Sequence, residues 1–160
     1  MEYPIYVRAG SILPILDHQR KHYSLLNALG DSKIKLQVYL EPRSEQAEGY
    51  LILDDGMTTD PSKVKVNTFY EKKVFSIAVE ADEDGFNPNK VIDTVEIHGL
   101  SAIPTSVKFN ETILGKYSAK YRVDFATRSV EIKGLNLRIT NQEVEKIDLF
   151  TLILPTHFVG

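Results

Sequence analysis

The sequence predicts an all-β protein built from antiparallel β-sandwiches. Apolar residues recur mostly at every second position, which is the period of a strand with one buried face. Turn-forming residues interrupt these runs at intervals typical of antiparallel sandwiches. Strands that follow one another without long helical segments argue against a parallel sheet with crossover helices.

The clearest strand is predicted at residues 33–40. Ile34, Leu36, Val38 and Leu40 share one face there, and the residues between them are polar or aromatic. The same alternation predicts further strands at 50–53, 64–69, 74–79, 91–98, 107–109, 121–125, 130–133, 135–139 and 149–154. One short helical turn is expected at 23–29, and Gly30-Asp31 would end it.

Turn chemistry separates the predicted strands, because Gly, Asn and Asp tolerate the backbone angles of tight turns. The turns are expected at Asp55-Gly56, Asp84-Gly85, Gly99, Asn110-Glu111, Gly115 and Gly134, and Gly10 is expected to kink the chain. A turn-rich segment with a proline at 57–62 marks a boundary. We therefore predict two domains, at residues 1–60 and 61–160.

Composition excludes several function classes. The 160 residues carry a formal net charge of −3, and the basic residues are scattered apart from Arg20-Lys21-His22, so no nucleic-acid partner is expected. No apolar stretch approaches the roughly 20 residues that span a bilayer, so no membrane partner is expected either. A secretory signal would have to precede Met1, and the lack of cysteine leaves the redox compartment open.

Three segments of the first third resemble glycoside hydrolase family 31. Residues 3–14 (YPIYVRAGSILP) resemble that family's strand pair after its catalytic barrel, with Ala9 in place of a usual Gly. Residues 33–41 and 47–56 resemble its next strand, loop and Asp-Asp-Gly turn, in the same order and spacing. Residues 17–26 look like a basic insertion of the glucosidase II catalytic subunit, and beyond them 91–100 is the one faint match.

The resemblance implies that this chain is the non-catalytic C-terminal region of a retaining α-glucosidase. Its two sandwiches would be the proximal and distal C-terminal domains, with the first incomplete at its N-terminus. The implied partner is the catalytic barrel of the same polypeptide, docked around residues 3–14 and 54–56. The narrower glucosidase II resemblance implies a separate β subunit, trimming of N-linked glycans and the endoplasmic reticulum lumen. An edge left unpaired by missing strands would favour self-association.

No catalytic residue is expected in this chain. Glycoside hydrolysis needs two carboxyl groups that flank one bond, about 5–5.5 Å apart in retaining enzymes. Asp54 and Asp55 are the obvious pair, but neighbours on a strand point to opposite faces, so a turn role is favoured. The resemblance agrees, since it implies that the catalytic aspartates lie on barrel strands that this chain lacks.

No metal or cofactor is expected. Asp82, Glu83 and Asp84 before Gly85 lack the ligand spacing of an EF-hand and are interpreted as a solvated acidic turn. The four histidines, His18, His22, His98 and His157, lack zinc-ligand spacing with Cys or carboxylate residues. Asn110-Glu111-Thr112 is an N-glycosylation sequon that would matter in a luminal protein.

An autonomous carbohydrate-binding module is the alternative, because sugar faces stack on exposed aromatic rings and the chain has 8 Tyr and 7 Phe. Phe75, Phe109, Tyr121 and Phe125 lie in alternating runs and are expected in the core, and there is no Trp. A third hypothesis, an unrelated structural sandwich, requires the motif match to be coincidental. We favour a supporting β-domain region of a family 31 α-glucosidase.

Overall fold

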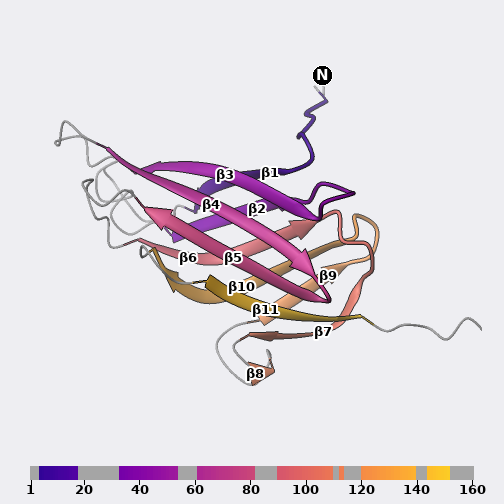
Figure 1. Cartoon of the computed structure of the whole chain (residues 1–160). Helices are drawn as coiled ribbons and strands as arrows, with labels where there is room; N and C mark the ends of the chain where they lie inside the picture. The colour runs from indigo at the N-terminus through magenta and orange to yellow at the C-terminus, as the bar shows by residue number, and fades with distance from the viewer. Residues whose placement is uncertain are drawn as a thin grey trace, which may run out of the picture.

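A computed structural model describes residues 4–17, 33–53, 61–81, 90–109, 112–113, 120–139 and 144–151. Across these residues the chain forms strands and no helix, which confirms the predicted all-β class (Figure 1). The strands are β1 (Ser11–Asp17), β2 (Lys33–Tyr39), β3 (Gln46–Leu53), β4 (Ser62–Glu71), β5 (Val74–Ala81), β6 (Val91–His98), β7 (Pro104–Phe109), β8 (Thr112–Ile113), β9 (Lys120–Asp124), β10 (Ser129–Arg138) and β11 (Val144–Thr151). The expected helical turn at 23–29 lies outside the described residues.

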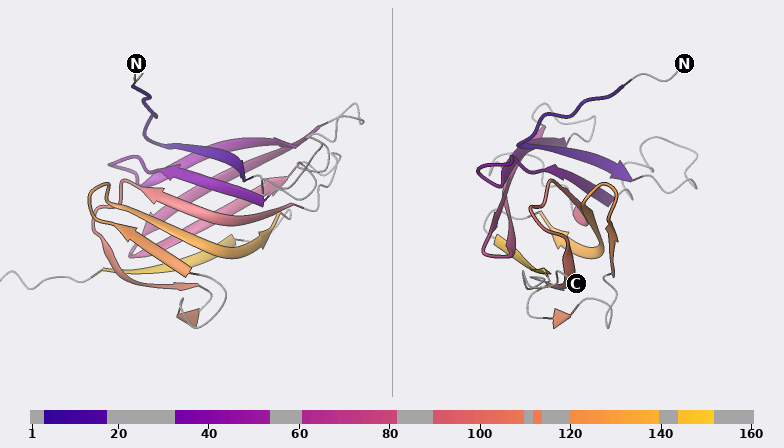
Figure 2. Two further views of the ribbon diagram at one scale, coloured as in Figure 1. Left: turned by 180° about the vertical axis from the view of Figure 1, so that it is seen from behind. Right: turned by 90° about the vertical axis from the view of Figure 1, so that its right-hand side faces the viewer.

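The described strands belong to one sheet in the order β8-β7-β11-β5-β4-β3-β1-β2-β6-β10-β9. The sheet curls until its two halves face each other, as the end-on view in Figure 2 shows. Near the open side, the Tyr121 hydroxyl of β9 donates a hydrogen bond to the Thr105 carbonyl of β7 at 3.3 Å. The curl therefore brings strands from opposite ends of the sheet together around one core.

Two strand pairings are parallel, and the sequence did not predict them. β2 pairs with β6 from Ile34↔Ile92 to Tyr39↔His98, with a one-residue bulge near Asp93. β1 touches β3 in parallel at a single pair, Ser11↔Glu48. The remaining pairings among the described strands are antiparallel, as expected. Parallel pairing joins segments that are distant in sequence, which local alternation does not reveal.

Strands from both predicted domains pair across the expected boundary. β3 runs antiparallel to β4 over eight residues, from Gln46↔Phe69 to Leu53↔Ser62. The connection at 54–60 lies outside the described residues. Because β2 also pairs with β6, residues before and after 60 share the sheet and the core. The division at 60/61 into two folding units stays a prediction.

The core follows the predicted alternation closely. Ile34, Leu36 and Val38 of β2 are fully buried, and Leu40 is nearly so. Phe75 of β5 is also fully buried, as expected. The buried apolar side chains form one contiguous cluster that draws on both halves of the sheet. Hydrophobic burial of this kind contributes roughly 1.5–3 kcal/mol for each large side chain.

Some local predictions were wrong for identifiable reasons. Gly134 does not end a strand: β10 continues through it, and its φ of 79° accompanies a register shift against β6. Between the paired positions, β10 has three residues (134–136) and β6 has one (Asp93), so this bulge lets β10 absorb two extra residues. Phe125 is not in the core; it lies one residue past β9 and is 73% exposed. Tyr121 is half-buried against the core.

Gly49 permits the close crossing of β1 over β3. A Cβ added at Gly49 would lie 2.5 Å from the Ile12 carbonyl oxygen and 2.7 Å from the Ile12 Cβ. The first of these is backbone, so a side-chain movement cannot relieve the clash. Only glycine allows the two strands to approach this closely.

We predict that Gly49→Ala destabilises the fold by about 1–3 kcal/mol, the usual cost of overpacking a tight site. Urea unfolding at neutral pH measures the change. Ile52→Ala serves as the control, because Ile52 lies on the same strand and is 66% exposed, so about 0.5 kcal/mol or less is expected. An unchanged midpoint for Gly49→Ala would contradict the crossing.

Candidate functional site

The N-terminal segment leaves the sheet at a kink centred on Gly10. Gly10 has a φ of 79°, which side-chain-bearing residues rarely adopt. Its N–H donates to the Tyr39 carbonyl at 2.7 Å, and its carbonyl accepts from the Glu48 N–H at 3.0 Å. The kink is thus held by both β2 and β3. The expected kink is confirmed, although residues 4–8 before it form no strand.

Residues 4–8 project away from the sheet (Figure 1). They include exposed apolar side chains. Ile5 is 89% exposed and Tyr6 is 88% exposed. Leu13 and Ile15 on the outer face of β1 are 39% and 40% exposed. We call these four residues the docking segment. They lie within or beside the segment 3–14, for which a docking role was predicted.

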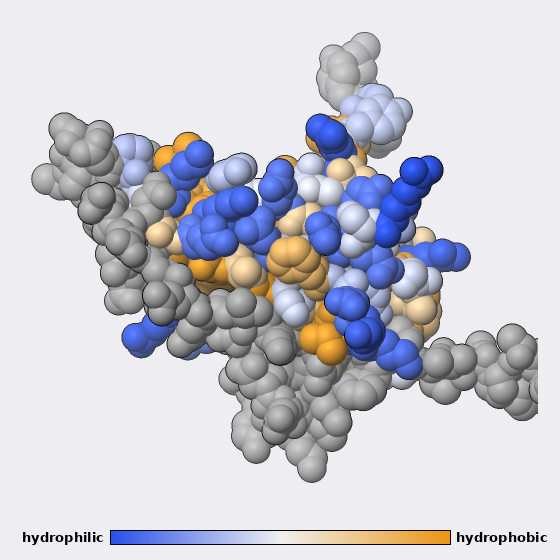
Figure 3. All heavy atoms as spheres, in the orientation of Figure 1, coloured by the Kyte–Doolittle hydropathy of each residue, from blue (hydrophilic) through white to orange (hydrophobic). Residues whose placement is uncertain are grey.

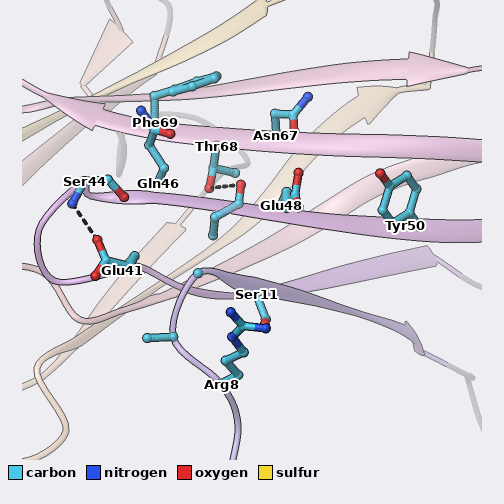
Figure 4. Close-up of a pocket in the computed structure, with 13 residues that line it drawn as sticks. Arg8, Ser11, Glu41, Ser44, Gln46, Glu48, Tyr50, Asn67, Thr68 and Phe69 are labelled. Carbon is cyan, nitrogen blue, oxygen red and sulfur yellow. Dashed lines mark hydrogen bonds between the residues drawn. The ribbon is translucent and has the colours of Figure 1, made fainter.

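A shallow hollow of about 450 Å³ lies beside the kink, where β1 and β3 meet (Figure 4). Its floor is the outer face of β3 and β4, and the 8–11 turn forms one side. Polar groups dominate the lining, including Arg8, Gln46, Glu48 and Asn67. Figure 3 shows that the surrounding face is mainly hydrophilic, with apolar side chains in separate small areas.

Glu41 closes the turn between β2 and β3 at the end of this hollow. Its carboxylate accepts hydrogen bonds from the backbone N–H of Ser44 at 2.6 Å and of Arg43 at 2.9 Å. The hydrogen bond from the Ser44 N–H is the main reason that the pKa of Glu41 lies below its usual value. The other hydrogen bonds of this turn to the carboxylate act in the same direction. This carboxylate is already engaged and supports the loop rather than offering a free acid.

Two aromatic rings flank the hollow on adjacent strands. Tyr50 of β3 is 49% exposed, and Phe69 of β4 is 43% exposed. The Lys63 ammonium lies 4.6 Å from the centroid of the Tyr50 ring, a cation–π contact that restricts the ring. The sequence alternation predicted the strands, but the position of these two rings around one hollow was missed.

A network of charged side chains, which we call the ionic ladder, crosses β2, β6 and β10 on their outer face. Lys35 Nζ lies 2.6 Å from Glu96 Oε2 and 2.9 Å from Glu131 Oε2. Glu131 also contacts Lys133 at 3.1 Å, and the Gln37 amide donates to Glu96 at 3.1 Å. The register explains the contact, because Gln37, Glu96 and Glu131 lie side by side.

His98 adjoins the ladder without joining it through a hydrogen bond. Its ring stacks on Tyr39 with centroids 4.6 Å apart and planes 5° from parallel. His98 Nε2 is 3.1 Å from Glu96 Oε1, yet it is buried without an aligned hydrogen-bond partner. The distance alone does not make a hydrogen bond, so we regard this as a close polar contact.

The paired carboxylates of the ladder do not have the properties of a glycosidase pair. Burial alone would raise the pKa values of Glu96 and Glu131, but hydrogen bonds from Lys35 and from Gln37 or Lys133 outweigh it and lower both. An acid catalyst needs a raised pKa so that it can hold a proton at neutral pH. Both carboxylates stay ionised, which suits a structural ion pair.

Several predicted sites fall outside the described residues: the Asp54-Asp55-Gly56 turn, the acidic turn at 82–85, His18, His22, His157 and Asn110-Glu111. In the part of the chain that the structure describes, no three His, Cys, Asp or Glu side chains gather as a metal site. Nor do those residues include a helix long and apolar enough to cross a membrane.

A second hollow lies near the open side of the curled sheet, between residues 101–105 and 121–128. It is more apolar than the first, and Phe125 lies at its wall. Phe125 is therefore exposed on a different part of the molecule from Tyr50 and Phe69, which makes it a useful comparison residue. Nothing in this hollow combines an aromatic ring with a paired carboxylate and amide.

Comparison with known proteins shows similarity at the level of fold. No family pattern and no curated sequence matches the chain. The structure resembles a glycoside hydrolase family 31 dextranase of Flavobacterium johnsoniae complexed with glucose, with a TM-score of 0.63 and 13% identity. A mutant of that dextranase complexed with isomaltotriose matches with a TM-score of 0.62 and 12% identity. An α-1,4-glucan lyase of Gracilariopsis lemaneiformis, in a covalent intermediate complex, matches with a TM-score of 0.57 and 20% identity.

These similarities cover most of this chain and a small part of the other enzymes. The match spans 89% of the chain and 19% of either dextranase chain, and 92% of the chain and 16% of the lyase. This chain therefore has the fold of a β-domain found within glycoside hydrolase family 31 enzymes. It spans less than a fifth of their length.

The ionic ladder predicts a pH-dependent contribution to stability. The lowered pKa values of Glu96 and Glu131 mean that their contribution is present above the ordinary carboxyl value of 4.5 and is lost as pH falls through the folded values. Burial alone would lower the pKa of Lys35. Its hydrogen bonds to Glu131 and Glu96 outweigh burial and raise the pKa above the ordinary value of 10.5. Its contribution is therefore lost only in strong base.

We expect Lys35→Met to cost about 1–3 kcal/mol at pH 7, because two partly buried carboxylates lose their shared cation. The cost should shrink as the pH falls below the ordinary carboxyl value of 4.5 and the carboxylates begin to protonate. Urea unfolding across pH 3–7 measures it. Lys133→Met is the control: Lys133 is 62% exposed, so about 0.5 kcal/mol or less is expected. A pH-independent cost for Lys35→Met would contradict the ladder.

Proposed function

We propose that this chain is the non-catalytic C-terminal β-domain region of a family 31 α-glucosidase and stabilises its catalytic barrel by docking on it. The observation that supports this most is the docking segment, in which Ile5 and Tyr6 are almost fully exposed and Leu13 and Ile15 are partly exposed in the described part of the chain. Large exposed apolar groups beside one another mark interaction sites. The fold similarity to family 31 enzymes supports the choice of partner.

The motif evidence and the structure support the same surface. Residues 3–14 carry the family resemblance, and within them Gly10 turns the chain away from the sheet. Ile5 and Tyr6 then project beyond it. A segment anchored at one end by two backbone hydrogen bonds and apolar at the other is suited to insertion against a neighbouring domain. Residues 3–14 also resemble the strand pair that follows the catalytic barrel in family 31 enzymes.

The parent activity we propose is retaining hydrolysis of terminal α-linked glucose, with catalytic carboxylates elsewhere in the polypeptide. The narrower assignment to glucosidase II, with its β subunit and its luminal location, rests on residues 17–26 alone. Nearly all of these lie outside the described residues. That assignment is therefore supported by the sequence resemblance only.

We predict that replacing both Ile5 and Tyr6 with Asp destabilises the full polypeptide by about 1.5–3 kcal/mol per side chain, because each loses an apolar contact with the barrel. Thermal unfolding of the full enzyme measures this. The same pair in the isolated 160-residue chain should leave its unfolding temperature unchanged, since both side chains are exposed there. Phe125→Asp, in an exposed turn, is the matched control.

Deletion of the 160 residues gives the decisive comparison for this role. If the remaining enzyme were equally stable and active, the supporting role would be refuted. If the full enzyme with Ile5→Asp and Tyr6→Asp were as stable as the unsubstituted enzyme, the docking segment would be refuted as the contact surface. Loss of stability by Phe125→Asp to the same degree would show a general surface effect instead.

We also predict that the isolated chain does not hydrolyse α-glucosides. The reason is the low pKa of Glu96 and Glu131, the paired carboxylates in the described residues, neither of which can supply a proton at neutral pH. Release of glucose from maltose or isomaltose is the measurement. Hydrolysis that disappears with Glu96→Gln or Glu131→Gln would overturn this prediction.

A further inference from the structure

The hollow beside β1 combines the two kinds of side chain that hold sugars. Tyr50 and Phe69 present partly exposed rings, and Glu48 and Asn67 lie between them on the same face (Figure 4). We infer that this hollow binds a short neutral oligosaccharide. The inference goes beyond the docking role, because it assigns a ligand to the described surface of this chain alone.

The register of β3 and β4 sets the spacing of the two rings. Tyr50 lies opposite Lys65, and Phe69 lies opposite Gln46, so the rings are four residues apart along the strand pair. At about 3.3 Å per residue this is roughly 13 Å. Such a span suits an oligosaccharide of a few hexose units, whose C–H faces pack on the two rings.

The centre of the hollow offers hydrogen-bonding groups that the fold leaves unused. Glu48 and Asn67 are directly opposite each other in the register. Neither side chain has a hydrogen-bond partner among the residues that the structure describes, in contrast to the Glu41 carboxylate. A carboxylate accepts and an amide both donates and accepts, so together they match neighbouring hydroxyl groups of a sugar ring.

Charge around the hollow favours an uncharged ligand. Arg8 lines the hollow together with two acidic residues, Glu41 and Glu48. Lys65 and Lys63 lie on the adjoining outer face of β4 and balance these carboxylates. A polyanion or a strongly charged peptide would meet repulsion from one set or the other. A polyhydroxylated neutral chain meets neither.

The experiment is a titration of the 160-residue chain with maltotriose and isomaltotriose, followed by NMR chemical-shift changes. We expect saturable binding in the millimolar range, with shifts concentrated at Glu48, Tyr50, Asn67 and Phe69. Tyr50→Ala and Phe69→Ala should each weaken binding about three- to tenfold, the equivalent of one stacking contact. Both side chains point outward, so thermal unfolding should confirm that the variants remain folded.

Phe125→Ala is the control, because it removes an exposed aromatic ring at the second hollow and should leave the affinity unchanged. Absence of binding to both trisaccharides overturns the inference. So does binding that survives Tyr50→Ala and Phe69→Ala, or shifts that cluster around Phe125. Tight binding of an acidic peptide at the same residues would also overturn it, in favour of a peptide site. None of these outcomes depends on the docking segment.

Discussion

The parallel pairing of β2 with β6 holds the rest of the structure in place. β2 is buried on its inner face by Ile34, Leu36 and Val38, and β6 contributes Val95 and Ile97 beside them. This pair bonds the N-terminal strands to the second half of the chain. The alternate residues of the same two strands necessarily point outward, which is why the ionic ladder lies there. One register therefore fixes both the core and the charged outer face.

Two glycines convert this sheet into a surface with a distinct site. Gly49 lets β1 cross β3 at contact distance, and Gly10 then bends the chain off the sheet. The hollow lies beside the kink at Gly10, over β3 and β4. A side chain at Gly49 would separate the strands, while one at Gly10 would strain a left-handed backbone. The site thus depends on backbone geometry more than on any single side chain that lines it.

Alternation predicted most of the strands, because one face of each is buried against a common core. The four apolar positions of 33–40 and Phe75 show this well. It failed at Gly134, where a bulge carries the strand onward, and at Phe125, where the strand ends one residue early. It could not reveal the hollow, because Tyr50 and Phe69 are placed around it only by the register of β3 and β4, which local sequence does not specify.

The two proposed surfaces meet at the N-terminal segment. Arg8 lines the hollow, and Ile5 and Tyr6 of the docking segment lie a few residues before it. Docking of this segment would therefore also fix the direction in which the hollow faces. An oligosaccharide held between Tyr50 and Phe69 would then lie close to the interface with the catalytic domain. The two proposed surfaces use different residues, and both adjoin the Gly10 kink.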